Sequence, residues 1–327
     1  MEIKTDYIIF WLLLFILNFF LFKFYIFFAK KLNFLDLSKK FKNPITPTSS
    51  GVILYVNILI GIFFILKDGH YDILPNNSGY AFISLTILVI ISFFDDVKSI
   101  DPKIRLFFQL ICIYVSLTSV EIVKLPLPFK ASLLFSLLIW VYIMNITNFI
   151  DGSDGFLGTN TLFVFINIVF LTYYLKLNIF SGIVAFFFLP SLVIFVYFFN
   201  KPNAKLYLGD TGSILIGYIN GFIFLELIIL QQFNIAISLY IYSLIDCSNA
   251  LIKKTLDGKL PWVDVSNYSF LQPGIKKNAN KIFVFYINII FNIINSLLII
   301  VQILFGWKFI ILNILISLIT MRIYEKK

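Results

Sequence analysis

Carboxylates and amides in three short segments are the side chains of this 327-residue chain best suited to chemistry. Asp95 and Asp96 lie in SFFDDVKSI, and Asp210 lies in LYLGDTGS. The third segment, MNITNFIDGSDGF, carries four polar residues spaced three positions apart: Asn145, Asn148, Asp151 and Asp154. Each segment stands at the end of a long apolar run, where a polar group is costly and is therefore a functional candidate.

The chemistry that these residues indicate is metal-assisted binding of a phosphate ester. Several carboxylates in a low-dielectric site would repel one another and take up protons unless a cation were present. Because the available ligands are oxygens, Mg²⁺ or Mn²⁺ is the natural ion, and Mg²⁺ usually binds substrate phosphates as well. On a continuous helix the four residues of the third segment would form one polar stripe, with Gly152 and Gly155 loosening the helix at its end.

The GDTGS segment, residues 209–213, predicts the beginning of a helix because it stands directly before an apolar run. Thr211 or Ser213 is expected to cap this helix, so that its free N–H groups and positive dipole end face an anion. Asp210 beside that end would hold the metal. The simpler alternatives are a plain helix cap for GDTGS and a solvated span end for Asp95 and Asp96.

Membrane-spanning helices must position these segments. The chain is 60% apolar and only 13% charged, whereas a soluble globule carries about 25% charged residues. Eleven apolar runs are present, at about 7–28, 51–66, 80–94, 106–120, 131–144, 156–175, 177–199, 213–230, 235–252, 282–304 and 309–321. A spanning helix needs about 20 apolar residues. The predicted fold is therefore all-α, a single integral-membrane domain over residues 1–327 with 10 or 11 transmembrane helices.

The basic residues predict the orientation of this bundle. With the N-terminus outside, nineteen basic residues fall on the cytoplasmic side and six on the external side, as the excess of Lys and Arg in cytoplasmic loops requires. The C-terminus is then cytoplasmic, together with loops at about 30–50, 95–105, 145–155, 200–212 and 253–281. All three polar segments lie on that side.

Other chemistries are excluded by composition. His70 is the sole histidine, and Cys112 and Cys247 each lie within an apolar run, so neither a zinc site nor a disulfide scaffold is expected. The basic excess lies in loops between spans and indicates no nucleic-acid partner. Gly217 and Gly221 in GYING predict close helix packing, whereas Glu226 and Asp246 receive no role.

The segments FFDDVKSIDPKIRLFFQ, MNITNFIDGSDGF and FNKPNAKLYLGDTGS resemble the integral-membrane polyprenyl-phosphate N-acetylhexosamine-1-phosphate transferases. This family includes enzymes that start O-antigen and teichoic-acid linkage synthesis, and the phospho-MurNAc-pentapeptide transferase of peptidoglycan. The resemblance covers about residues 30–281. It implies transfer of an N-acetylhexosamine 1-phosphate from a UDP-sugar to undecaprenyl phosphate, with release of UMP, at the cytoplasmic face of the bacterial inner membrane.

The resemblance also implies roles for individual residues. Mg²⁺ or Mn²⁺ would be held at Asn148 and Asp210. The catalytic carboxylates would be Asp95, Asp96, Asp151 and Asp154. The substrate-binding residues would be Asn145, Lys98, Arg105, Asn203, Lys205, Tyr207, Gly209, Thr211 and Ser213. Tyr207 falls where members carry an aromatic that stacks on uracil. The implied partners are UDP-N-acetylhexosamine, undecaprenyl phosphate and membrane lipid, and a homodimer is left open.

The chain departs from the family pattern at two places. ITPTSSG, residues 45–51, stands where many members have Pro-Thr-Pro-Arg-x-Gly-Gly, and WVDVSNYSFLQPG in the last large loop lacks their histidine pair. These departures bear on the sugar preference and leave a non-catalytic homologue as one alternative. A transporter with an acidic site is the other, although such sites lie near mid-membrane and these carboxylates lie at span ends.

Overall fold

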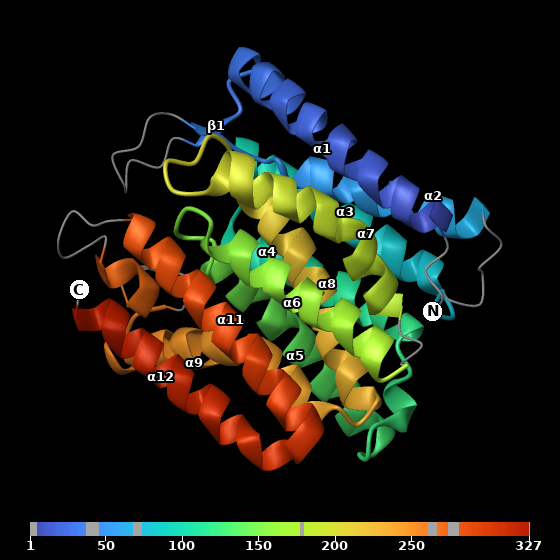
Figure 1. The fold of residues 1–327 in the computed structure, drawn as a ribbon, viewed down its shortest axis with the longest axis vertical. Coiled ribbons are helices and arrows are strands. Elements are labelled where there is room, and N and C mark those ends of the chain that lie inside the picture. The colour runs from blue at the N-terminus through green and yellow to red at the C-terminus, as the bar shows by residue number, and fades with distance from the viewer. Residues whose placement is uncertain are drawn as a thin grey trace.

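Eleven α-helices form the part of the chain that the structure, a computed structural model, describes: residues 5–36, 46–67, 74–176, 180–260, 267–273 and 281–326 (Figure 1). They are α1 (Thr5–Lys31), α2 (Gly51–Lys67), α3 (Ser78–Val97), α4 (Pro102–Ser116), α5 (Phe129–Phe149), α6 (Phe156–Tyr174), α7 (Phe180–Ile194), α8 (Gly209–Ile229), α9 (Phe233–Leu256), α11 (Lys281–Phe305) and α12 (Ile310–Lys326). Each predicted apolar run overlaps one of these helices, so the all-α fold is confirmed.

Short elements connect the helices. Strands β1 (Leu35–Asp36) and β2 (Thr46–Pro47) pair antiparallel. A π-helical segment, Phe195–Asn200, extends α7. The 3₁₀ turns are Leu117–Ser119, Ile122–Lys124, Ser269–Leu271 and Trp307–Phe309. His70 and parts of the predicted loops 30–50 and 253–281, including residues 262–266 and 274 of the segment that lacks the histidine pair, lie outside the described residues.

Nine helices of the described residues are long and apolar enough to cross a membrane. The two others are α2, with 17 residues, and α4, with 15 residues. Gly306, at φ 107°, and the turn after it separate α11 from α12, so the last two apolar runs are two helices. Large apolar side chains such as Phe20, Phe24 and Phe63 are exposed, as expected for a bundle that faces lipid.

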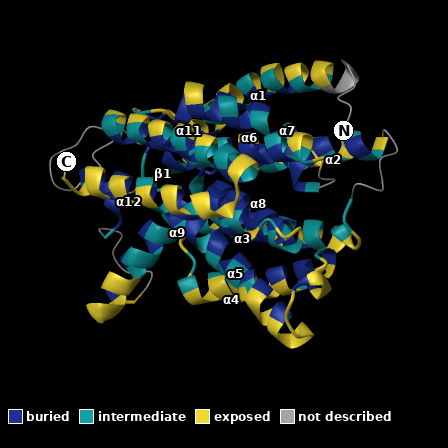
Figure 2. Cartoon of the chain, turned by 60° about the horizontal axis from the view of Figure 1, so that its bottom comes forward, coloured by how far each residue is buried: buried dark blue, intermediate teal, exposed yellow. Residues whose placement is uncertain are grey.

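Helix α8 lies at the centre of the bundle and is largely buried, whereas α1 lies along the outside (Figures 1 and 2). Gly217 and Gly221 bring α8 against α5. A Cβ at Gly217 would lie 2.7 Å from the Met144 carbonyl oxygen, and one at Gly221 would lie 2.0 Å from Cδ1 of Trp140. The close packing predicted for GYING is therefore confirmed, and it holds the two helices that carry Asn148 and Asp210 together.

The polar segments meet at one end of the bundle. Contacts join the end of α3 to the beginnings of α4 and α8, and the residues that follow α5 to the beginning of α11. The chain termini lie at opposite ends of the long helices in Figure 1, as an odd number of membrane passages requires. Which end faces the cytoplasm stays a prediction.

Candidate active site

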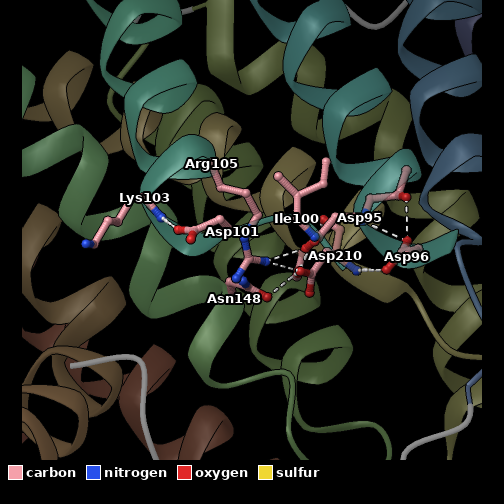
Figure 3. Close-up of polar contacts among 10 residues, drawn as sticks. Asp95, Asp96, Ile100, Asp101, Lys103, Arg105, Asn148 and Asp210 are labelled. Atoms are coloured by element: carbon pink, nitrogen blue, oxygen red, sulfur yellow. Dashed lines mark hydrogen bonds and ion pairs between the residues drawn. The ribbon is translucent and has the colours of Figure 1, made fainter. Parts of the chain in front are cut away.

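An arginine links two of the predicted carboxylates at this end of the bundle (Figure 3). Nη1 of Arg105, in the first turn of α4, donates to Oδ2 of Asp95 at the end of α3 and to Oδ2 of Asp210 at the beginning of α8. The two bonds join three helices, of which α8 lies about 100 residues further along the chain than α3 and α4. Arg105 was predicted as a substrate ligand, and in the structure it pairs with the site's own carboxylates.

The turn between α3 and α4 positions Arg105. Pro102 stands at the beginning of α4, where its missing N–H is no loss, and Asp101 caps the helix by accepting from the Lys103 N–H at 2.8 Å. Oδ1 of Asp95 accepts from the Ile100 N–H at 2.6 Å. Both carboxylate oxygens of Asp95 are therefore engaged, one by the turn and one by Arg105.

Asp96, the neighbour of Asp95, caps α8 from outside that helix. Its carboxylate accepts from the N–H groups of Asp210 at 2.7 Å and Thr211 at 3.2 Å, and from the Thr211 hydroxyl at 2.6 Å. The prediction that Thr211 or Ser213 caps α8 is wrong, because the partial positive charge at a helix N-terminus favours a carboxylate and α3 supplies one. Two N–H groups expected to face an anion are occupied by Asp96.

Gly209 allows this close approach. Its φ of +70° favours glycine, and a Cβ there would lie 2.4 Å from Oδ2 of Asp96. The predicted substrate-binding role of Gly209 is thus accompanied by a clear structural one. Any larger residue would push the Asp96 carboxylate away from the beginning of α8.

Asn148 lies beside Asp210 and Arg105 (Figure 3). Its Oδ1 accepts from the Ser213 hydroxyl at 2.8 Å. Helix α5 continues through Phe149, so the predicted loop 145–155 begins later than expected and Asn148 is helical. The predicted single polar stripe is wrong beyond Asn148, because α5 ends before Asp151 and Asp154. Asn145, one turn deeper, donates to Gln109 Oε1 at 2.8 Å and so joins α5 to α4.

Asp154 organises the loop before α8. Its carboxylate, 3% exposed, accepts from the N–H groups of Asn203 at 3.1 Å and Ala204 at 3.2 Å, and from the Tyr207 hydroxyl at 3.2 Å. Lys281, at the beginning of α11, reaches both oxygens at 3.1 Å. The sequence interpretation missed Lys281, because no motif surrounds it and 127 residues separate the pair. These contacts give Asp154 a positioning role.

Tyr207 is half-buried and lies in the short loop that the sequence predicts. Its backbone N–H donates to the Pro47 carbonyl at 2.9 Å, and its carbonyl accepts from the Ser50 hydroxyl at 2.8 Å. The segment that departs from the family pattern, ITPTSSG, thus packs directly on this loop. Lys98, Asn203 and Lys205 are exposed around the site.

The two carboxylates left without a role are both structural. Asp246, fully buried in α9, accepts from the Ser269 N–H at 3.0 Å and from the Tyr242 hydroxyl at 3.3 Å. Glu226 accepts from the N–H groups of Phe180 at 3.1 Å and Ser181 at 3.3 Å. It therefore caps α7 at the end of the bundle opposite the site.

The oxygen atoms of the side chains around Arg105 are suitable ligands for Mg²⁺. Among the described residues no group of three His, Cys, Asp or Glu side chains could hold a metal ion. Mg²⁺ needs fewer protein ligands, since it is usually held by one or two carboxylates together with waters and substrate phosphates. Asp210, Asn148 and Asp95 offer two carboxylates and an amide oxygen next to one another.

Known proteins resemble part of this chain. Phospho-N-acetylmuramoyl-pentapeptide-transferase of Leuconostoc mesenteroides is 32% identical over 138 residues, 38% of this chain and 41% of that protein. Probable undecaprenyl-phosphate N-acetylglucosaminyl 1-phosphate transferase of Bacillus subtilis is 24% identical over 194 residues, 55% of this chain and 51% of that protein. The chain thus spans about half the length of these curated relatives.

The family match covers residues 79–228 and carries the description "Glycosyl transferase family 4". This stretch contains Asp95, Arg105, Asn148 and Asp210, the residues that meet in Figure 3. It leaves out Lys281 and the segment before α2, which contact the site from outside the matched stretch. The matched stretch, with the acidic segments inside it, is therefore similar to glycosyl transferase family 4.

Proposed function

We propose that this protein transfers an N-acetylhexosamine 1-phosphate from a UDP-sugar to undecaprenyl phosphate at the cytoplasmic membrane surface, releasing UMP. This would be the initiating step of a cell-envelope polysaccharide. The observation that carries the proposal is the Asp95–Arg105–Asp210 cluster beside Asn148, at the ends of apolar helices and inside the stretch that matches the family. The names of the relatives from Leuconostoc and Bacillus support the same reaction class.

The proposed reaction depends mainly on neutralising the charge of the two phosphate-bearing substrates and on aligning them. A phosphate monoester is already mostly dianionic near neutral pH, because its second pKa is about 6. The attacking lipid phosphate therefore needs no strong general base, and orienting two anions in line supplies much of the rate. When bound, Mg²⁺ would neutralise charge on the diphosphate and act as a Lewis acid. Asp210 and Asn148 would hold it.

The chain's own residues then have separate tasks. Asp96 holds the first turn of α8 and so orients Asp210. Asp154 and Lys281 hold the loop that presents the ring of Tyr207, which would stack on the uracil. We favour direct attack by the lipid phosphate over an aspartyl-phosphate intermediate on Asp96, because both oxygens of Asp96 accept hydrogen bonds from the beginning of α8.

UMP release by the purified full chain in lipid nanodiscs tests the proposal. We expect release that requires a UDP-N-acetylhexosamine, undecaprenyl phosphate and Mg²⁺ together. The matched control is Glu121→Gln, since Glu121 is exposed and pairs only with Lys124 among the contacts described. Release of UMP without the lipid phosphate, or no release from folded protein with any UDP-N-acetylhexosamine, would contradict the transferase. A transporter would instead accumulate its substrate without cleaving it.

A further inference from the structure

Arg105 occupies the position between Asp95 and Asp210 that a metal ion would need. Its Nη1 contacts Oδ2 of both carboxylates, so one guanidinium already offsets part of the negative charge of the pair. We propose that Arg105 is the internal counter-ion of this site: its guanidinium holds the two carboxylates when no divalent cation is bound and leaves them when one binds. This inference rests on the metal site of the proposed function.

The exposure of the three side chains supports an exchange of cations. The Asp95 side chain is only 7% exposed, and the Asp210 side chain is 31% exposed. Two carboxylates this close cannot both stay ionised without a nearby positive charge. A guanidinium supplies that charge at any physiological pH, because arginine is not deprotonated in proteins. Arg105 therefore offsets one of the two negative charges of the pair before any metal arrives.

The exchange is competitive for a simple reason. Arg105 contacts one oxygen of each carboxylate, Oδ2 of Asp95 and Oδ2 of Asp210. A guanidinium and a divalent cation at the same oxygens repel each other. Arg105 itself is 28% exposed and lies on the first turn of α4, so its long side chain has a path away from the pair. Once released, it can bind a phosphate group through two parallel N–H bonds.

Mn²⁺ binding without substrate tests the competition. The full-length protein in nanodiscs is titrated with Mn²⁺, and free Mn²⁺ is measured by electron paramagnetic resonance. Arg105→Gln should bind Mn²⁺ at least about tenfold more tightly than the wild type. The reason is that Mn²⁺ no longer has to displace an ion pair at low dielectric, and the free energy of such a pair corresponds to more than a tenfold change in affinity. Arg105→Lys, which keeps a competing cation, should stay close to the wild type.

Lys103→Gln is the matched control. It removes one positive charge two residues away, from an exposed side chain that points away from the carboxylates (Figure 3). It should leave the Mn²⁺ affinity unchanged, which separates competition from a general loss of positive charge. Equal or weaker Mn²⁺ binding by folded Arg105→Gln would overturn the inference.

A second measurement needs no substitution. Arg105 and Arg322 are the two arginines of the chain. An arginine-selective dicarbonyl reagent followed by mass spectrometry therefore measures the labelling rate of Arg105, with the exposed Arg322 as an internal reference. Mg²⁺ should raise the labelling rate of Arg105 and leave that of Arg322 unchanged. Labelling of Arg105 that Mg²⁺ leaves the same or slows would overturn the inference.

The same titration distinguishes this inference from the proposed function. Asp210→Asn should abolish the specific Mn²⁺ site in the Arg105→Gln background. If neither the wild type nor Arg105→Gln shows a site that Asp210→Asn removes, the metal site itself is wrong, and the inference falls with it. If the site exists and Arg105→Gln leaves its affinity unchanged, only the counter-ion role is wrong.

Discussion

Asp95, Asp96 and Asp210 are three carboxylates with three different surroundings, and only Asp210 combines partial exposure with a contact that a metal could replace. Asp210→Ala should therefore lower turnover by orders of magnitude, since a lost metal contact in the transition state commonly costs several kcal/mol. The melting temperature should change little. EDTA should abolish the wild-type activity in the same assay. Near-normal turnover of folded Asp210→Ala, or full turnover in EDTA, would contradict the metal assignment.

Asp96 should behave differently, because it caps α8 through three hydrogen bonds. Asp96→Ala should lower the stability of the protein by about 1–2 kcal/mol, the usual loss for a helix cap, and should also lower turnover by displacing Asp210. A thermal melt beside the UMP assay checks both effects. Low activity with an unchanged melting temperature would show that Asp96 acts on substrate and not on the helix.

The ring and the hydroxyl of Tyr207 have different proposed roles: the ring would stack on the uracil, and the hydroxyl donates to Asp154. Tyr207→Ala should raise the KM for the UDP-sugar, since a stacked base is worth about 1–3 kcal/mol in nucleic-acid sites, and should leave the KM for the lipid phosphate unchanged. Tyr207→Phe keeps the ring and loses the bond from the hydroxyl to Asp154, worth about 1 kcal/mol, so its kinetic effect should be small. Loss of stability with an unchanged UDP-sugar KM would instead make Tyr207 a membrane-interface anchor.

Among the helices, the crossing of α2 and α8 is the contact that sets the site. A Cβ at Gly51 would lie 2.2 Å from Cα of Gly212, so the two helix beginnings touch through their backbones. This contact places Ser50 against the Tyr207 carbonyl and keeps α8 in register with Asp96. The helix that carries Asp210 is thus held from both α2 and α3.

Gly51→Ala should separate α2 from α8 and lower both stability and turnover. Overpacking of this kind costs about 1–3 kcal/mol, which a thermal melt measures. Gly79→Ala in α3 is the control, because a Cβ there meets nothing within 4 Å and alanine favours helix over glycine. If both variants melt at the same temperature as the wild type, the crossing is looser than its geometry indicates.

At the scale of the whole protein, the proposed function requires an orientation in the membrane that gives the site access to a cytoplasmic nucleotide sugar. In intact cells, Asn76→Cys should react with a membrane-impermeant thiol reagent, and Asp257→Cys should react only after the cells are opened. Both positions are exposed, and the natural Cys112 and Cys247 are buried, so background labelling should be low. The reverse pattern would place the Asp95–Arg105–Asp210 cluster on the external side.

The amino-acid sequence was sufficient to predict the eleven helices and the residue types of the site. Apolar runs are long and separated by short polar segments, and lipid forces the backbone of each run to bond within itself, so its helical state needs no knowledge of its neighbours. The acidic residues were equally visible, because a carboxylate next to such a run is rare and costly. The spacing of Gly217 and Gly221 predicted close packing, and the structure confirmed it.

Only the tertiary structure decided which groups these carboxylates meet. Asp96 caps a helix that begins 113 residues later, at Gly209, and Asp154 pairs with a lysine 127 residues away. Such pairings depend on how whole helices cross, which local spacing does not encode, and so the predicted Thr211 cap and the polar stripe through Asp154 were wrong. The position of Arg105 between Asp95 and Asp210 has the same origin, because three separate helix ends have to meet before one guanidinium can pair with two carboxylates.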